Sequence, residues 1–154
     1  MPAPPPSPVA PSNRRLSLIL AGLAMIGPFS IDTMFPAFAR MGAQFGADKL
    51  AMQQTISVYL LAYAAMSLVH GPLSDAVGRR RVILSGLLVF ALASAGCALS
   101  TSLPMLLFFR VLQGLSAGVG FVVGRAVIRD VRHGDDAQRL LSQVSMLFGI
   151  APAI

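Results

Sequence analysis

Long apolar runs separated by short polar segments dominate the pattern of this chain. Such runs occupy residues 16–39, 50–70, 82–100 and 103–125. A helix rises 1.5 Å per residue, so about 20 apolar residues cross a hydrocarbon core of roughly 30 Å. The pattern therefore predicts four complete transmembrane helices, the last two joined by a short link that makes them an antiparallel pair.

The two ends of the chain follow other patterns. Residues 1–13 are rich in proline and predict a disordered cytoplasmic tail. A fifth apolar stretch, at residues 138–154, is too short to span and predicts only the beginning of another helix. We therefore expect residues 14–154 to form the N-terminal bundle of a larger protein, of which the C-terminal half is missing.

The first apolar run has a second interpretation, as a cleaved secretory signal. It follows two arginines and contains a small-x-small sequence at residues 37–39. Its length, the presence of Asp32 and the further runs behind it favour a retained helix instead.

Composition agrees with a membrane protein. The mean hydropathy is +0.73, with 55% apolar and 12% charged residues, outside the usual soluble range. The net charge of +6 would suit nucleic-acid binding only if a soluble domain carried it on one face. Here the basic residues lie between apolar runs, so we expect an all-α membrane protein in contact with the lipid bilayer and no nucleic-acid partner.

The basic residues also predict an orientation. If the helices alternate in direction, one side holds Arg14, Arg15, Arg79, Arg80, Arg81, Arg125, Arg129, Arg132 and Arg139. The other side holds only Arg40 and Lys49. Because arginine and lysine accumulate on the cytoplasmic side, we expect a multi-pass protein of the bacterial inner membrane with a cytoplasmic N-terminus.

The segment between the second and third runs has a distinctive composition. It reads Gly-Pro-Leu-Ser-Asp-Ala-Val-Gly-Arg-Arg-Arg over residues 71–81, which predicts a tight turn with one carboxylate among cations. An ordinary cytoplasmic loop would explain the arginines but not the spacing of the glycines and the aspartate. The candidate functional residues here are Gly71, Leu73, Asp75, Gly78, Arg79 and Arg80.

The fourth run contains an arginine and a glutamine inside the membrane. Arg110, Gln113, Gly114 and Ala117 are spaced i, i+3, i+4, i+7 and share one helical face. An arginine within a span costs about 2.5–3.5 kcal/mol on insertion scales, so it faces a partner or a wet cavity. The alternative is an arginine that pairs only to fix helix packing.

Small residues recur on the same helix. Gly114 with Gly118, and Gly120 with Gly124, form two small-xxx-small pairs. We expect these glycines to be close-packing surfaces for neighbouring helices rather than binding residues.

Asp32 is the only carboxylate inside a complete predicted span, and the chain contains no glutamate. Counting from the ends of their helices places Asp32 and Arg110 at similar depth in the outer half of the membrane. Burial favours the protonated acid, whereas a nearby guanidinium favours the carboxylate, so movement could switch the proton on and off. The alternative is a carboxylate near the interface that merely pairs or reaches water.

Taken together, these motifs resemble the major facilitator superfamily. Its loop between spans two and three reads G-x-L-[SA]-D-[RK]-x-G-R-[RK], which this chain matches except at Ala76, where a basic residue is usual. The run from Arg110 to Gly114 is similar to the R-x-x-Q-G motif of its fourth span. The segments at 31–36, 71–75 and 125–130 further resemble the Bcr/CflA branch of drug:proton antiporters.

The resemblance implies proton-driven export of small amphipathic molecules by a partial major facilitator fold. It implies proton coupling or a substrate cavity at Asp32, Arg110 and Gln113, and control of conformation by the loop through Asp75 and Arg79. The missing cation at Ala76 puts the strength of that control in doubt.

Three alternatives remain open from the sequence: a carrier of a specific metabolite, a membrane subunit that transports nothing and, less well supported, a pore.

His70 and His133 lack metal-ligand spacing, and Cys97 and the serines lack a paired base. We therefore expect neither an enzyme nor a resident cofactor or metal.

Overall fold

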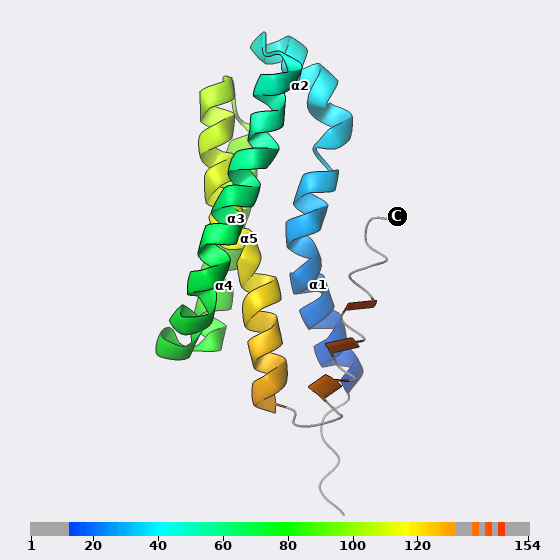
Figure 1. Cartoon of the computed structure of the whole chain (residues 1–154), viewed down its shortest axis with the longest axis vertical. Coiled ribbons are helices and arrows are strands. Elements are labelled where there is room, and N and C mark those ends of the chain that lie inside the picture. Colours follow the sequence, from blue (N-terminus) through cyan, green and yellow to red (C-terminus); the bar gives the residue numbers. More distant parts are fainter. Residues whose placement is uncertain (1–12, 132–136, 139–140, 143–144, 147–154) are drawn as a thin grey trace, which may run out of the picture.

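The computed structural model describes residues 13–131, 137–138, 141–142 and 145–146, and the described part contains helices and turns but no strand. The elements are α1 (Asn13–Asp32), the 3-10 helix η1 (Phe35–Ala37), α2 (Phe38–Phe45), α3 (Lys49–Val77), α4 (Arg79–Ala98) and α5 (Leu103–Val131) (Figure 1). The predicted tail lies outside the described residues, apart from Asn13, which begins α1. Most of the predicted fifth helix also lies outside them.

Four helical segments in the described part are long and apolar enough to cross a membrane. They are Arg15–Phe45, Lys49–Val77, Arg79–Ala98 and Leu103–Val131. The predicted all-α, multi-pass membrane fold is confirmed. In Figure 1 the start of α1, the α3–α4 connection and the end of α5 lie at one end of the bundle, called the Gly78 end below.

The first predicted span, at 16–39, is not one continuous helix. α1 ends at Asp32, and a turn at Thr33 and Met34 leads into η1. Pro36 explains the break because it has no backbone N–H to donate to the carbonyl oxygen of Asp32, four residues before it. Pro28, in contrast, lies within α1 without ending it.

The predicted turn after the second span is much shorter than expected. α3 continues through Pro72 to Val77, and α4 begins at Arg79, so only Gly78 lies outside a helix. Gly78 has φ 102° and ψ 136°, a backbone conformation that side-chain-bearing residues rarely adopt. One glycine is therefore sufficient to reverse the chain direction.

α5 is the central helix of the bundle and contacts α1, α3 and α4. Its glycines allow close approach. A Cβ at Gly114 would overlap the Tyr59 carbonyl oxygen of α3, and one at Gly120 would overlap the Leu23 carbonyl oxygen of α1. Gly118 packs against Ser67 and His70 of α3.

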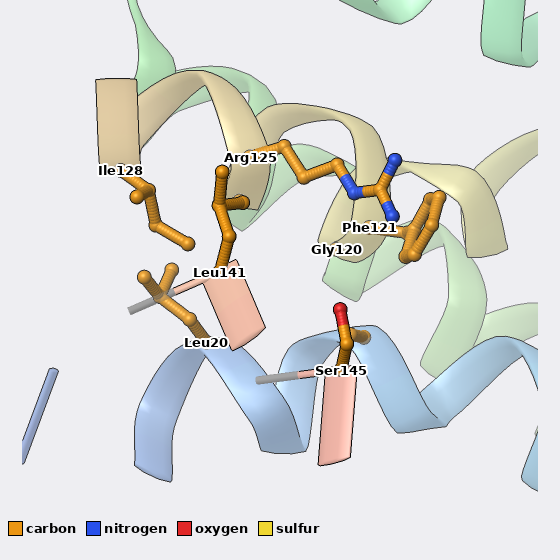
Figure 2. Close-up of a pocket in the computed structure, with 9 residues that line it drawn as sticks. Leu20, Gly120, Phe121, Arg125, Ile128, Leu141 and Ser145 are labelled. Carbon is orange, nitrogen blue, oxygen red and sulfur yellow. The ribbon is translucent and has the colours of Figure 1, made fainter. Parts of the chain in front are cut away.

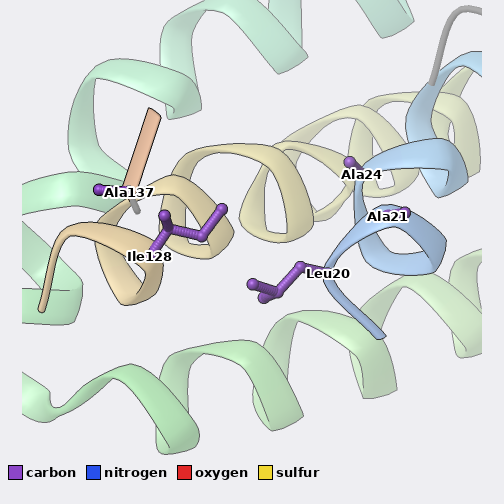
Figure 3. Packing of buried hydrophobic residues seen from close by; sticks show 5 residues of the cluster. All are labelled: Leu20, Ala21, Ala24, Ile128 and Ala137. Atoms are coloured by element: carbon purple, nitrogen blue, oxygen red, sulfur yellow. The ribbon is translucent and has the colours of Figure 1, made fainter. Parts of the chain in front are cut away.

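An apolar cluster joins the Gly78-end halves of α1 and α5. Leu20, Ala21 and Ala24 of α1 pack there with Ile128 of α5 and with Ala137 (Figure 3). Because α5 has neighbours on several sides, its polar residues can lie inside the bundle rather than in lipid.

Candidate functional site

Arg110 lies at the centre of a buried polar cluster and is only 1% exposed. Its Nη1 donates to the carbonyl oxygen of Ser30 at 3.3 Å, to Ser30 Oγ at 3.1 Å and to Gln113 Oε1 at 2.8 Å. Its Nε donates to the carbonyl oxygen of Thr55 at 3.3 Å. One guanidinium therefore links α1, α3 and α5.

An aromatic ring completes this environment. The guanidinium carbon of Arg110 lies 4.4 Å from the ring centroid of Tyr59, within range of a cation–π interaction. The Tyr59 hydroxyl donates to the carbonyl oxygen of Gly27 at 2.9 Å, which ties α3 to α1 beside the arginine. The cation is thus stabilised by carbonyl oxygens and a π-face.

Gln113 extends the cluster to α4. Its amide Nε2 donates to Ser94 Oγ at 2.8 Å, and Ser94 Oγ donates to the carbonyl oxygen of Phe90 at 2.7 Å. Cys97 Sγ lies 3.9 Å from Gln113 Oε1, a weak contact. The arginine and glutamine together organise polar groups from all four long helices.

A cavity of about 540 Å³ adjoins this cluster and is called the Arg110 cavity below. Its polar wall includes Ser30, Ser94, Arg110 and Gln113, and its remaining lining is largely apolar. The buried Nη2 of Arg110 has no hydrogen-bond partner among the residues that the structure describes. A buried donor left unsatisfied costs free energy, so an acceptor brought within hydrogen-bond distance of this nitrogen would be stabilising.

Asp32 lies close to this cluster along the chain but does not pair with Arg110. The ion pairs among described residues are those of Arg79, and Asp32 is exposed at the end of α1. Residues two positions apart on a helix are separated by about 200° around its axis. Asp32 therefore points away from the face on which Ser30 binds Arg110. The next two residues, Thr33 and Met34 in the turn after α1, line the Arg110 cavity.

A second cluster surrounds Arg79 at the Gly78 end. Arg79 Nη2 lies 2.5 Å from Asp75 Oδ1, and Arg79 Nε donates to Asp130 Oδ2 at 2.9 Å. Arg79 Nη1 also donates to the buried hydroxyl of Ser74. Arg79 thereby connects α3, α4 and the end of α5, while Leu73 and Arg80 are exposed on either side of the turn and Gly71 lies within α3.

Sequence reasoning missed several of these partners. Ser30, Thr55 and Ser94 are small polar residues, which occur in many spans and give no periodic signal. Asp130 was visible as an acid among arginines, but its pairing with Arg79 joins residues 51 positions apart. Tyr59 lies within an apolar run and has no distinguishing motif around it, and its contact with Arg110 depends on how α3 crosses α5.

Comparison with known proteins gives the family. The family model described as Major Facilitator Superfamily matches residues 19–154. Multidrug resistance protein D of Escherichia coli (strain K12) is 33% identical over 142 residues, which cover 92% of this chain and 36% of that protein. The chloramphenicol resistance protein of Pseudomonas aeruginosa is 31% identical over 138 residues, covering 89% and 33%.

A third relative is an uncharacterized MFS-type transporter, YdgK, of Bacillus subtilis (strain 168). It is 33% identical over 148 residues, covering 96% of this chain and 37% of that protein. The chain thus spans roughly a third of the length of these relatives. Its helical bundle, its buried arginine and the match over residues 19–154 agree: the chain belongs to the major facilitator superfamily.

Proposed function

We propose that this chain is the N-terminal part of a proton-coupled carrier that exports small amphipathic molecules. The observation that carries the proposal is Arg110, a fully buried cation that borders a cavity of about 540 Å³ and whose Nη2 has no partner in the described part of the chain. Buried charges in spans mark ion or substrate pathways. The printed names of relatives, multidrug and chloramphenicol resistance proteins, support drugs as substrates.

The proposed coupling uses Asp32 and Arg110 together. Asp32 lies two positions after Ser30, the residue of α1 that accepts hydrogen bonds from Arg110. Rotation of the segment around Asp32 would bring the carboxylate toward the free Nη2. Asp32 would then release its proton, and moving the carboxylate away from the cation to an apolar position would let it bind a proton again.

The cavity lining suits amphipathic substrates. Apolar side chains such as Phe29, Met34 and Phe90 line one part, and the polar groups of Arg110 and Gln113 line another. A molecule with an apolar body and one acceptor group would satisfy both parts.

The Arg79 cluster would control conformation. Its ion pairs hold three helices together at one end of the bundle, and carriers of this kind move two bundles about a central site. The C-terminal half of the same protein is the proposed second bundle. Arg79 to Arg81 at the Gly78 end support a cytoplasmic N-terminus in the bacterial inner membrane.

The experiment is proton-driven dye efflux in everted vesicles containing the full-length protein at matched expression. Asp32→Asn and Arg110→Gln are compared with wild type and with Arg15→Gln, an exposed charge outside both clusters. We expect the first two variants to lose efflux and Arg15→Gln to retain it. Efflux that survives in Asp32→Asn would contradict coupling through this residue, and no dye movement by any form would favour a metabolite carrier or a subunit without transport.

A further inference from the structure

Two arginines on the last turns of α5 have no carboxylate partner in the part of the chain that the structure describes. Arg125 and Arg129 are spaced i, i+4 and therefore lie on one helical face. Asp130, the nearest acid along the sequence, binds Arg79 instead. Two exposed cations are thus available at the Gly78 end of α5.

Arg125 is held in a defined position. Its guanidinium carbon lies 4.0 Å from the ring centroid of Phe121, one turn deeper along α5. Figure 2 shows the guanidinium stacked on this ring, on the same side of the helix as the Ser145 hydroxyl. The guanidinium therefore lies along the helix against this ring, on a side chain that is still exposed.

Two cavities adjoin this arginine. One, of about 550 Å³, is lined by Phe121, Val122, Arg125, Arg129, Leu141 and Ser145 and is called the cationic cavity. The other, of about 250 Å³, is called the apolar chamber, and Leu20, Ala24, Phe121, Ile128 and Leu141 supply its apolar walls. The two share Phe121, Arg125, Leu141 and Ser145, so the cationic cavity adjoins the apolar chamber, whose lining residues Figure 2 shows.

This combination distinguishes among possible ligands. Arginines that only set topology would need no cavity, and a free phosphate would need no apolar chamber. A guanidinium binds phosphate oxygens well because its planar donors match their geometry. A neutral apolar molecule would gain nothing from the two cations.

We propose that the cationic cavity and the apolar chamber together bind one anionic phospholipid. The phosphate lies between Arg125 and Arg129, with the Ser145 hydroxyl as a further donor. Part of an acyl chain enters the chamber beside Leu20 and Ile128. Basic pockets between helices at the cytoplasmic side suit anionic headgroups, and this site is independent of the proposed transport cycle.

The test is native mass spectrometry of the full-length protein in detergent, titrated with phosphatidylglycerol. Each lost arginine removes an attraction to the headgroup, so we expect Arg125→Gln/Arg129→Gln to weaken phosphatidylglycerol binding at least about tenfold. The matched control is Arg15→Gln/Arg81→Gln, which removes two exposed charges that do not line the cavities and should leave binding within about twofold. Size-exclusion elution shows whether each variant remains folded.

Two further ligands show whether the site requires an anionic headgroup and whether it requires an acyl chain. Phosphatidylcholine, with a neutral headgroup, should bind the wild type about as weakly as phosphatidylglycerol binds the double variant. Glycerol phosphate, a headgroup without a chain, should not compete. Equal losses in both double variants, equal binding of phosphatidylcholine, or competition by glycerol phosphate would each overturn the proposal.

Discussion

Arg110 shows how a full positive charge is placed inside a helical bundle with no carboxylate partner among the described residues. Its N–H groups donate to carbonyl and side-chain oxygens of three helices, and its guanidinium lies over the aromatic ring of Tyr59. The planar fork of an arginine makes this possible, because several donors diverge from one rigid group. A lysine has one compact ammonium and cannot reach acceptors on three helices at once.

We therefore expect Arg110→Lys to destabilise the full-length protein. The loss of hydrogen bonds from a charged donor should lower the free energy of unfolding by about 1.5–3 kcal/mol. Thermal denaturation followed by size-exclusion chromatography measures the change. Arg81→Lys, an exposed substitution, is the control and should alter it by less than about 0.5 kcal/mol. Equal melting of both variants would contradict the structural role of Arg110.

The glycines of α5 give a second prediction at this scale. Gly114→Ala places a methyl group on the Tyr59 carbonyl oxygen, so α3 and α5 must separate. Overpacking of this kind costs about 1–3 kcal/mol, which should appear as a lower melting temperature. Gly22→Ala is the matched control, because nothing lies within 4 Å of its Cβ. Gly22→Ala should be neutral or slightly stabilising, since alanine favours helices. If it lowered the melting temperature as much as Gly114→Ala does, the close contact between Gly114 and Tyr59 would be contradicted.

Residue spacing predicted only part of the site. The period of Arg110, Gln113 and Gly114 identifies one face of a helix, and all three are buried. Their partners on other helices depend on the rotation of each helix about its axis, which hydropathy does not define. Asp32 illustrates this limit, because depth along α1 was estimated but the direction of its side chain was not.

At the scale of elements, the connection between α3 and α4 consists of a single residue. Gly78 combines φ 102° with ψ 136°, and its N–H donates to the carbonyl oxygen of Ser74 at 3.1 Å. The long helices therefore meet almost directly, and Arg79 begins α4 in a position to bind both Asp75 and Asp130.

Gly78→Ala should weaken this connection. A Cβ in that backbone conformation is strained by about 1–3 kcal/mol, although no atom lies within 4 Å of it. The variant should melt at a lower temperature and be cleaved faster by protease near residue 78. Gly71→Ala is the control, because Gly71 lies within α3 and a Cβ added there would meet open space. Similar behaviour of the two variants would contradict the conformation of Gly78.

The number and order of the helices could be predicted from the apolar runs, whereas their boundaries could not. α3 and α5 extend to Val77 and Val131, beyond the predicted ends at residues 70 and 125. Helical hydrogen bonds continue past the hydrocarbon region, so hydropathy underestimates helix length. The break after Asp32 was missed because Pro28 and Pro36 look alike in the sequence, yet only Pro36 accompanies a helix end.

At the scale of the whole molecule, the described bundle has large apolar surfaces. Leu61 and Leu68 of α3 are 74% and 81% exposed, and α4 presents Leu88 and Leu92 in the same way. These surfaces suit lipid or further helices, in agreement with a chain that spans roughly a third of its relatives. Substrate specificity therefore belongs to the complete protein and could not follow from these residues alone.

The most direct test of proton coupling is substrate-induced proton release by the purified full-length protein. In weakly buffered detergent solution, a transported dye should displace a proton from wild type. Asp32→Asn should bind dye without releasing one. Asp48→Asn is the control, because asparagine also caps a helix well and Asp48 caps α3 through Ala51. Release by wild type and Asp48→Asn but not by Asp32→Asn is the predicted result; undiminished release by Asp32→Asn would contradict it.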